Sequence, residues 1–118
     1  NPKAQITVAG HGSMTFELFR NQVPTMAARF QQLITQGFYT NKPIDFIANG
    51  LYVEAGGGDS SLPDINDEFD TNLQHNRAGL LSFVKNGGDD SANAEFMITD
   101  GPLRSRDFDN PIFGMLVK

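Results

Sequence analysis

Two short apolar segments separated by a turn-rich loop constrain the fold of this chain most strongly. The first covers residues 79–85 (Gly-Leu-Leu-Ser-Phe-Val-Lys) and the second covers residues 94–99 (Ala-Glu-Phe-Met-Ile-Thr). Runs of this length that are rich in Leu, Phe, Val and Ile and bounded by Gly, Asn and Asp are typical of buried strands. Residues 86–91 between them favour turns and leave too little room for a helix. We therefore predict two core strands around which the rest of the chain is organised.

The flanking sequence predicts further strands and one helix. Residues 5–9 and 14–19 alternate in polarity on either side of a Gly-His-Gly-Ser turn, which indicates a hairpin. Between Pro24 and Gly37, apolar residues recur at helical spacing, so we expect a helix over about Pro24–Gln36. Its predicted buried face consists of Met26, Phe30, Leu33 and Ile34.

The remaining segments add strands and loops. Residues 38–58 predict one or two strands with a tight turn at Asn49-Gly50, and residues 112–117 predict a last strand. Residues 59–70 are acidic and turn-rich, so we expect a surface loop there. Because strands outnumber the single helix, the predicted fold is mainly β, a small barrel with a capping helix. With 118 residues, the chain is long enough for one domain, 1–118.

Charge and composition exclude several classes of partner. The formal net charge of −5 and the lack of a basic cluster argue against a nucleic acid or an anionic membrane as the main partner. There is no cysteine, so thiolate chemistry is excluded, and no apolar stretch approaches the ~20 residues of a membrane span. The chain starts at Asn1-Pro2 without Met, which suggests a processed or exported chain or an excised domain; the compartment is left open.

Composition and spacing alone point to no particular chemistry. His11 and His75 lie in a turn and in a polar loop without metal-ligand spacing, so we interpret both as surface histidines. The acidic loop lacks the glycine and the terminal glutamate of a calcium loop, and we expect no metal and no cofactor. We interpret Gly56-Gly57-Gly58 as a site of backbone crowding or a bulge rather than as a phosphate cradle. No serine has the context of a hydrolase nucleophile, and the clustered acids of one loop do not favour glycoside chemistry.

A likeness to a known family emerges from segments that occur along nearly the whole chain, in the expected order and spacing. These segments are Phe16-Glu17-Leu18-Phe19, Pro24-Thr25, Phe30 and Leu33 with Gly37-Phe38-Tyr39, Asp67-Glu68-Phe69, Leu73-Gln74-His75-Asn76-Arg77, Gly79-Leu80-Leu81-Ser82, Glu95-Phe96-Met97-Ile98-Thr99 and Ile112-Phe113-Gly114. In these segments the sequence resembles the cyclophilin family of peptidyl-prolyl isomerases. The resemblance implies a closed antiparallel β-barrel with helices over its open ends and a groove for proline-containing peptides on its outer wall.

The resemblance also marks a missing catalytic group. In the family, a Phe-His-Arg triplet follows the Gly-x-Tyr segment, and its arginine donates a hydrogen bond that weakens the double-bond character of the prolyl amide. An ungapped comparison places Ile44-Asp45-Phe46 there, so Phe46 occupies the arginine position. Rotation about a peptide bond faces a barrier of ~20 kcal/mol, and loss of one preorganised donor typically costs ~10²–10³ in rate.

Other positions that the resemblance assigns to the groove are replaced as well. Leu51, Tyr52 and Glu54 stand for the family's Phe-Met-x-Gln, Val84 and Lys85 for its Ala-Asn, and Glu95, Phe96 and Met97 for its Gln-Phe-Phe. Ser105, Arg106 and Asn110 correspond to its Trp, Leu and His. We expect Phe96 to be the retained part of the hydrophobic floor. Glu54 and Glu95 introduce acceptors, and negative charge when they are ionised, where amides face the peptide in the family.

The end of the chain differs from the family pattern too. Cyclophilins usually continue through another helix and a strand that closes the barrel against the N-terminal strand, whereas this sequence ends at Lys118. We therefore expect a fragment of a longer protein, or a partner in a larger complex that supplies the closure. An open edge between the first and last strands would otherwise invite pairing with a partner.

Two functional hypotheses follow from the resemblance. In the first, the chain is a cyclophilin-like domain whose isomerase activity is weak or lost, and it acts as a binding or structural module in a larger assembly. In the second, it is an active prolyl isomerase that assists protein folding, with Lys85 or Arg106 supplying the lost donor. The partner in both is a protein or a proline-containing peptide.

Overall fold

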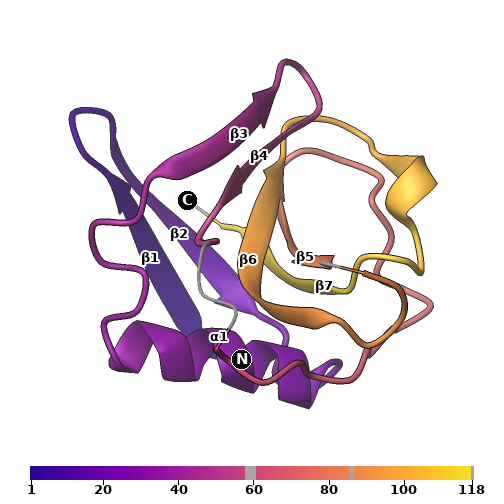
Figure 1. The fold of residues 1–118 in the computed structure, drawn as a ribbon. Helices are drawn as coiled ribbons and strands as arrows, with labels where there is room; N and C mark the ends of the chain where they lie inside the picture. Colours follow the sequence, from indigo (N-terminus) through magenta and orange to yellow (C-terminus); the bar gives the residue numbers. More distant parts are fainter. Residues whose placement is uncertain (58–60, 86, 118) are drawn as a thin grey trace.

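The computed structural model describes residues 1–118 except 58–60, 86 and 118, and within that part the chain forms one curled antiparallel sheet and one α-helix (Figure 1). The strand order in the sheet is β1-β2-β7-β5-β6-β4-β3. The elements are β1 (Lys3–Val8), β2 (Gly12–Leu18), α1 (Pro24–Thr35), β3 (Ile44–Ala48), β4 (Tyr52–Ala55), β5 (Leu80–Lys85), β6 (Ala92–Thr99), the 3₁₀-helix η1 (Arg104–Arg106) and β7 (Ile112–Leu116). The predicted mainly β architecture with a single helix is confirmed.

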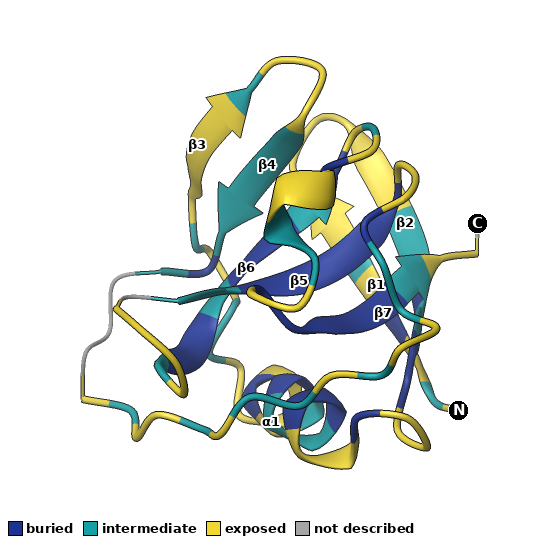
Figure 2. Cartoon of the chain, turned by 90° about the vertical axis from the view of Figure 1, so that its right-hand side faces the viewer, coloured by how far each residue is buried: buried dark blue, intermediate teal, exposed yellow. Residues whose placement is uncertain are grey.

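The two predicted core strands are β5 and β6, which pair antiparallel at the centre of the sheet. Leu81 lies opposite Ile98, and Phe83 lies opposite Phe96. On its other side β5 pairs with β7, so the two neighbours of β5 cover both of its edges. Figure 2 shows that buried residues concentrate on β5, β6 and β7, as expected for strands read from continuous apolar runs.

The sheet is curled but not closed in the part of the chain that the structure describes. Its two ends are β1 and β3, which do not pair with each other. We expected the open edge between the first and last strands, but β7 pairs with both β2 and β5 and is therefore an interior strand. The unpaired edges belong to β1 and β3 instead, because the hairpins β1-β2 and β3-β4 each add their outer strand to the end of the sheet.

Helix α1 runs across one end of the curled sheet (Figure 1). It begins at Pro24, whose fixed φ suits the first helical turn, and it ends before Gly37, which has a φ of +73°. The buried face contains Met26, Phe30 and Leu33 as predicted. Ile34 was expected there, but it is 41% exposed, and Ala27 is buried in its place.

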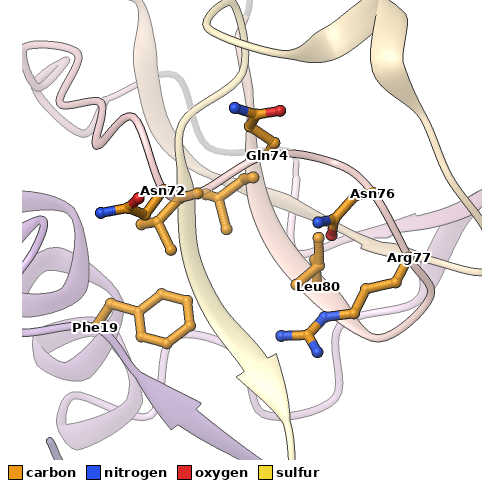
Figure 3. Close-up of a pocket in the computed structure, with 8 residues that line it drawn as sticks. Phe19, Asn72, Gln74, Asn76, Arg77 and Leu80 are labelled. Carbon is orange, nitrogen blue, oxygen red and sulfur yellow. The ribbon is translucent and has the colours of Figure 1, made fainter.

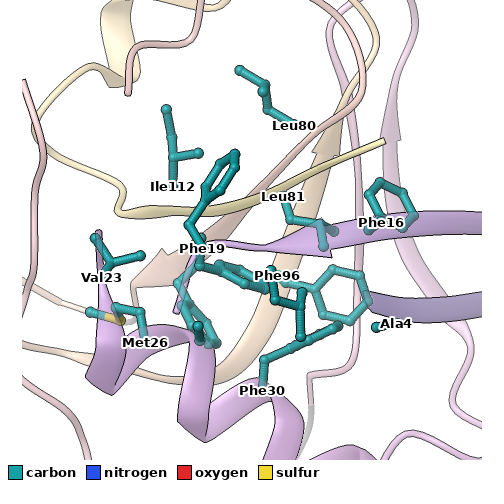
Figure 4. Close-up of a cluster of buried hydrophobic side chains, with 14 of the residues drawn as sticks. Ala4, Phe16, Phe19, Val23, Met26, Phe30, Leu80, Leu81, Phe96 and Ile112 are labelled. Atoms are coloured by element: carbon teal, nitrogen blue, oxygen red, sulfur yellow. The ribbon is translucent and has the colours of Figure 1, made fainter. Parts of the chain in front are cut away.

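Phenylalanine rings fill the space between the helix and the sheet (Figure 4). The ring of Phe30 on α1 contacts Tyr39, Phe96 and Phe113 at centroid distances of 5.2, 5.2 and 4.8 Å. Phe83 of β5 stacks on Phe113 of β7 at 4.4 Å. These contacts fix the helix against β5, β6 and β7, and they leave the opposite face of β3, β4 and β6 outside the core.

Candidate functional site

Strands β3, β4 and β6 place four of the predicted groove residues, together with Phe46, on one face of the sheet, away from α1. Phe46 of β3 pairs with Glu54 of β4, and Glu54 pairs with Met97 of β6. Paired residues point to the same side, and alternate residues of one strand share a face, so Tyr52 and Glu95 belong to this face too. We call these five residues the outer face. Leu51 borders it in the turn between β3 and β4 and is 45% exposed.

An aromatic and cationic row crosses the outer face. The ring of Phe46 is 51% exposed and lies 6.2 Å from the ring of Tyr52. The guanidinium of Arg106, which reaches the face from η1, lies 5.6 Å from the centroid of Tyr52. Arg106 Nη1 also donates a hydrogen bond to Asn110 Oδ1 at 3.4 Å. The position assigned to the catalytic arginine thus presents a phenyl ring, and the cation that contacts this face, Arg106, comes from another segment.

Carboxylates replace amides on the same face. Glu95 is close to Glu54 and hydrogen-bonds with Asp45, which in turn accepts the backbone N–H of Gly57 at 3.1 Å. Partial burial is the largest cause, and together with the nearby charges of Glu54 and Asp45 and the hydrogen bond to Asp45 it raises the pKa of Glu95 to about 6. Near neutral pH this part of the face is therefore acidic, with one carboxyl that takes up a proton more readily than an ordinary glutamate.

Lys85 is held by three aspartates rather than presented to the outer face. Its ammonium donates to Asp67 Oδ2 at 2.9 Å and lies 3.4 Å from Asp109 Oδ1 and 3.7 Å from Asp89 Oδ1. The side chain is only 4% exposed. Burial alone would lower the pKa of Lys85, but the carboxylates of Asp67 and Asp109 outweigh it and hold the pKa above its ordinary value. The ammonium thus donates one hydrogen bond, to Asp67, and has two further carboxylates within ion-pair distance.

Phe96 does not lie where the resemblance led us to expect it. It packs in the core against Phe30 and Tyr39, and Met97, the next residue along β6, points to the outer face. Adjacent residues of a strand face opposite sides of the sheet, so Phe96 and Met97 cannot both point to the outer face. Met97 is almost fully buried, so it forms an apolar base for the outer face. Val84 is partly buried in β5, just where its pairing with β6 becomes irregular.

Asn110 has a structural role in the segment that covers the end of β5. Its side chain is 4% exposed, and its Nδ2 donates to the backbone carbonyl of Phe83 at 3.0 Å. The same residue receives the hydrogen bond from Arg106 described above. The predicted groove residue Asn110 therefore anchors the segment that brings Arg106 to Tyr52.

His75 is not a surface histidine, in contrast to the sequence-based interpretation. The residue has no exposed surface; its Nδ1 lies 3.0 Å from Asp107 Oδ1, and its Nε2 lies 3.0 Å from Ser82 Oγ. Burial lowers the pKa of His75 despite the opposing effect of Asp107, so the ring is neutral near pH 7. A carboxylate only accepts, so Nδ1–H donates to Asp107, and the Ser82 hydroxyl lies within hydrogen-bond distance of both Nε2 and the backbone carbonyl of Asn110, at 3.0 and 3.2 Å.

This Asp-His-Ser arrangement has the order of a nucleophile with its base, but Ser82 is fully buried. A hydroxyl without exposed surface is not accessible to a substrate, so the arrangement serves to join β5 to the segment after η1. Sequence reasoning missed it because Asp107 is 32 residues from His75 in the chain. His11, by contrast, is exposed as predicted.

The glycine-rich segment is crowded, as its composition predicted. A Cβ on Gly56 would lie 2.6 Å from a ring carbon of Tyr39, and a Cβ on Gly57 would lie 2.5 Å from Glu95 Oε2. Gly58 and Asp59 lie outside the described residues. Among the described residues, no three His, Cys, Asp or Glu side chains are grouped to hold a metal ion. No helix in the described part is long and apolar enough to cross a membrane.

Comparison with known proteins agrees with the architecture. Residues 3–118 match the family model of the cyclophilin type peptidyl-prolyl cis-trans isomerase/CLD. The chain belongs to the cyclophilin family. It is 32% identical over 111 residues to the peptidyl-prolyl cis-trans isomerase cypE of Dictyostelium discoideum, covering 87% of this chain and 70% of that protein. It is equally similar, at 32% over 111 residues, to the peptidyl-prolyl cis-trans isomerase-like 1 of Aspergillus niger, with 87% of this chain and 68% of that protein covered.

Solved cyclophilins share the fold. A cyclophilin type peptidyl-prolyl cis-trans isomerase of Cryptosporidium parvum, crystallised in the presence of the dipeptide Ala-Pro, superposes with a TM-score of 0.90 at 25% identity. The match covers 99% of this chain and 79% of that structure. The mainly β cyclophilin fold predicted from the sequence is therefore confirmed. Members of this family act on prolyl peptide bonds and bind proline-containing peptides or proteins.

Proposed function

We propose that this chain is a cyclophilin domain with weak or absent isomerase activity that binds proline-containing peptides or proteins as a module of a larger assembly. The single observation behind the proposal is Phe46, a half-exposed ring packed against Tyr52 at the position that the family resemblance assigns to the catalytic arginine. A phenyl ring donates no hydrogen bond, so it offers no preorganised donor to the prolyl nitrogen.

The state of Lys85 supports the same proposal. A substitute donor would have to turn its N–H groups toward a bound peptide, but the ammonium of Lys85 contacts Asp67, Asp89 and Asp109 and is almost fully buried. Withdrawing it would leave the buried carboxylate of Asp67 without its partner. In this proposal Lys85 therefore has a structural role, and the exposed Phe46 and the partly buried Tyr52 contact the peptide.

The test is an NMR titration of the domain with alanyl-prolyl peptides. Chemical-shift changes at outer-face residues such as Tyr52 report binding, and exchange between the cis and trans peptide signals reports catalysis. We expect shifts at the outer face with little acceleration of exchange. Exchange as fast as that of an active family member, measured side by side, would contradict the proposal.

An alternative is an active isomerase in which Arg106 supplies the donor. The observation in its favour is the position of the guanidinium over Tyr52, on the same face as Phe46. Arg106 is only partly buried and has a single hydrogen bond to Asn110, at the long distance of 3.4 Å, so it is free to turn toward a ligand. Under this alternative, Arg106→Gln abolishes exchange catalysis, whereas the same change at the surface residue Arg20 leaves it intact.

A further inference from the structure

A small cavity lies apart from the outer face, between the loop of residues 72–77 and the ends of β2, β5 and β7 (Figure 3). Its volume is about 60 Å³. The apolar part of its lining consists of the partly buried Leu73 and of Phe19, Leu80 and Ile112, the last three each no more than 5% exposed. Its rim is polar, because Asn72, Asn76 and Arg77 border it from the loop.

Arg77 is the cation of this rim, and it has no acidic partner among the described residues. The guanidinium donates to the thioether sulfur of Met115 at 3.0 Å, a weak acceptor, and none of the ion pairs of the described residues includes Arg77. Figure 3 shows the Arg77 guanidinium and the Asn76 amide on one side of the Phe19 ring and the Asn72 amide on the other. The rim thus combines an unpaired guanidinium with two amides that can donate and accept.

From this arrangement we propose that the cavity binds the C-terminal residue of a peptide or protein that ends in a small branched apolar side chain. The carboxylate pairs with Arg77, which matches its two oxygens with two N–H groups. The amide of Asn76, on the same side of the Phe19 ring as the guanidinium, bonds the last peptide group, and the apolar side chain enters the space over Phe19, Leu80 and Ile112.

The volume of the cavity and the positive charge on its rim favour this ligand. A water-sized group needs ~15 Å³ of such a volume, so 60 Å³ admits about four groups, enough for the isopropyl group of valine but too few for an aromatic ring. The chain carries a net charge of −5, which opposes anions elsewhere on its surface, whereas an Arg without a carboxylate partner attracts one. The proposal does not depend on the proposed function, because the cavity shares no residue with the outer face.

The experiment uses peptides without proline, so that the outer face is not engaged. Acetyl-Ala-Ala-Val with a free carboxylate is titrated into the isotopically labelled protein, beside its C-terminal amide, acetyl-Ala-Ala-Phe and 3-methylbutanoate. We expect saturable shifts at Phe19, Leu80 and Ile112 with the free-acid valine peptide and binding about tenfold or more weaker for the amide and for the phenylalanine peptide.

Two substitutions test whether the charge of Arg77 is required for binding. Arg77→Gln is expected to weaken binding of the valine peptide about tenfold or more, because the amide cannot pair with both carboxylate oxygens. Arg20→Gln is the matched control, since the guanidinium of Arg20 bonds Gln31 on α1, and it should leave binding unchanged. Equal binding of acid and amide, or unchanged binding by Arg77→Gln, would overturn the proposal. Binding of 3-methylbutanoate as tight as that of the peptide would overturn the assignment to a peptide terminus.

Discussion

At position 46 a half-exposed phenyl ring contacts Tyr52, beside a pair of glutamates on β4 and β6. The resemblance to the family assigns a guanidinium to this position. A single replacement of this kind removes the donor while leaving the strand intact, because Phe suits a β-strand as well as Arg does. The proposed loss of isomerase activity can therefore be tested by changing one or two side chains.

We predict that Phe46→Arg combined with Glu54→Gln raises catalysis of cis-trans exchange in alanyl-prolyl peptides. The arginine supplies a donor, and removal of the Glu54 charge opposite it keeps the guanidinium from forming an ion pair across the strands. Because one such donor is typically worth ~10²–10³ in rate, we expect a gain of at least ~10-fold. NMR exchange spectroscopy measures the exchange rate. The control is the double variant that combines Phe46→Leu with Glu54→Gln and therefore lacks the donor. No gain, in a variant that still binds the peptide, would mean that the position has no catalytic role in this chain.

A second residue-scale prediction concerns the charge of Glu95. Its pKa is raised from 4.5 to about 6, so the folded protein binds more protons than the unfolded chain between these pH values. Stability therefore falls as the pH rises from about 4.5 to 6, and the loss persists at higher pH. We expect Glu95→Gln to be more stable than the parent at pH 7.5 and about equal to it near pH 4.5. Urea unfolding at both pH values tests this, and a stability difference that does not depend on pH would contradict it.

The elements are positioned by side chains from distant loops as well as by their own sequences. Helix α1 has no side-chain cap from its own N-cap residue, Val23, and no acidic residue in its first turn. Its third residue, Met26, donates its backbone N–H to Glu68 Oε1 at 2.8 Å, 42 residues away. Glu68, one of the acidic residues that we predicted to lie in a surface loop, thus caps the N-terminus of the helix.

We predict that Glu68→Ala lowers the free energy of unfolding by about 1 kcal/mol, the usual effect of losing a helix cap. The loss arises because the N–H of Met26 then has no acceptor and the helix N-terminus has no nearby negative charge. Urea denaturation measures the change. Glu17→Ala, which removes only an exposed hydrogen bond to Asn1, is the control and should change stability little. Equal effects of the two substitutions would show that Glu68 does not cap the helix.

On the scale of the whole molecule, Lys85 joins segments that are far apart in the chain. Its ammonium lies at the end of β5 and contacts Asp67, Asp89 and Asp109, which belong to three different loops. Asp67 is itself 8% exposed and also accepts the backbone N–H of Asp90. These contacts hold the three loops together at the end of β5, so Lys85 helps to fix their arrangement.

We predict that Lys85→Met destabilises the fold by roughly 3 kcal/mol, since removing one member of a buried ion pair leaves the other charge unpaired. Adding Asp67→Asn should restore part of the loss, because the buried negative charge is then gone. Urea unfolding of the single and double variants gives the comparison. A double variant less stable than Lys85→Met alone would mean that Asp67 stabilises the fold independently of Lys85.

Local sequence patterns determined the elements of this protein. The apolar runs specified β5 and β6, Asn49-Gly50 specified the turn between β3 and β4, and Pro24 and Gly37 bounded the helix. These features depend on backbone preferences and on periodic burial, which act within a few residues. The family resemblance added the fold and the assignment of Phe46 to the arginine position.

Only the tertiary structure decided which side chains meet. It brought Asp107 and Ser82 to His75, enclosed Lys85 among three aspartates, turned Phe96 into the core and Met97 to the outer face, and placed Arg106 over Tyr52. Each of these outcomes depends on strand register and on loops that return from distant positions. A sequence pattern does not contain that information, because the burial and the partner of a polar side chain are properties of the assembled fold.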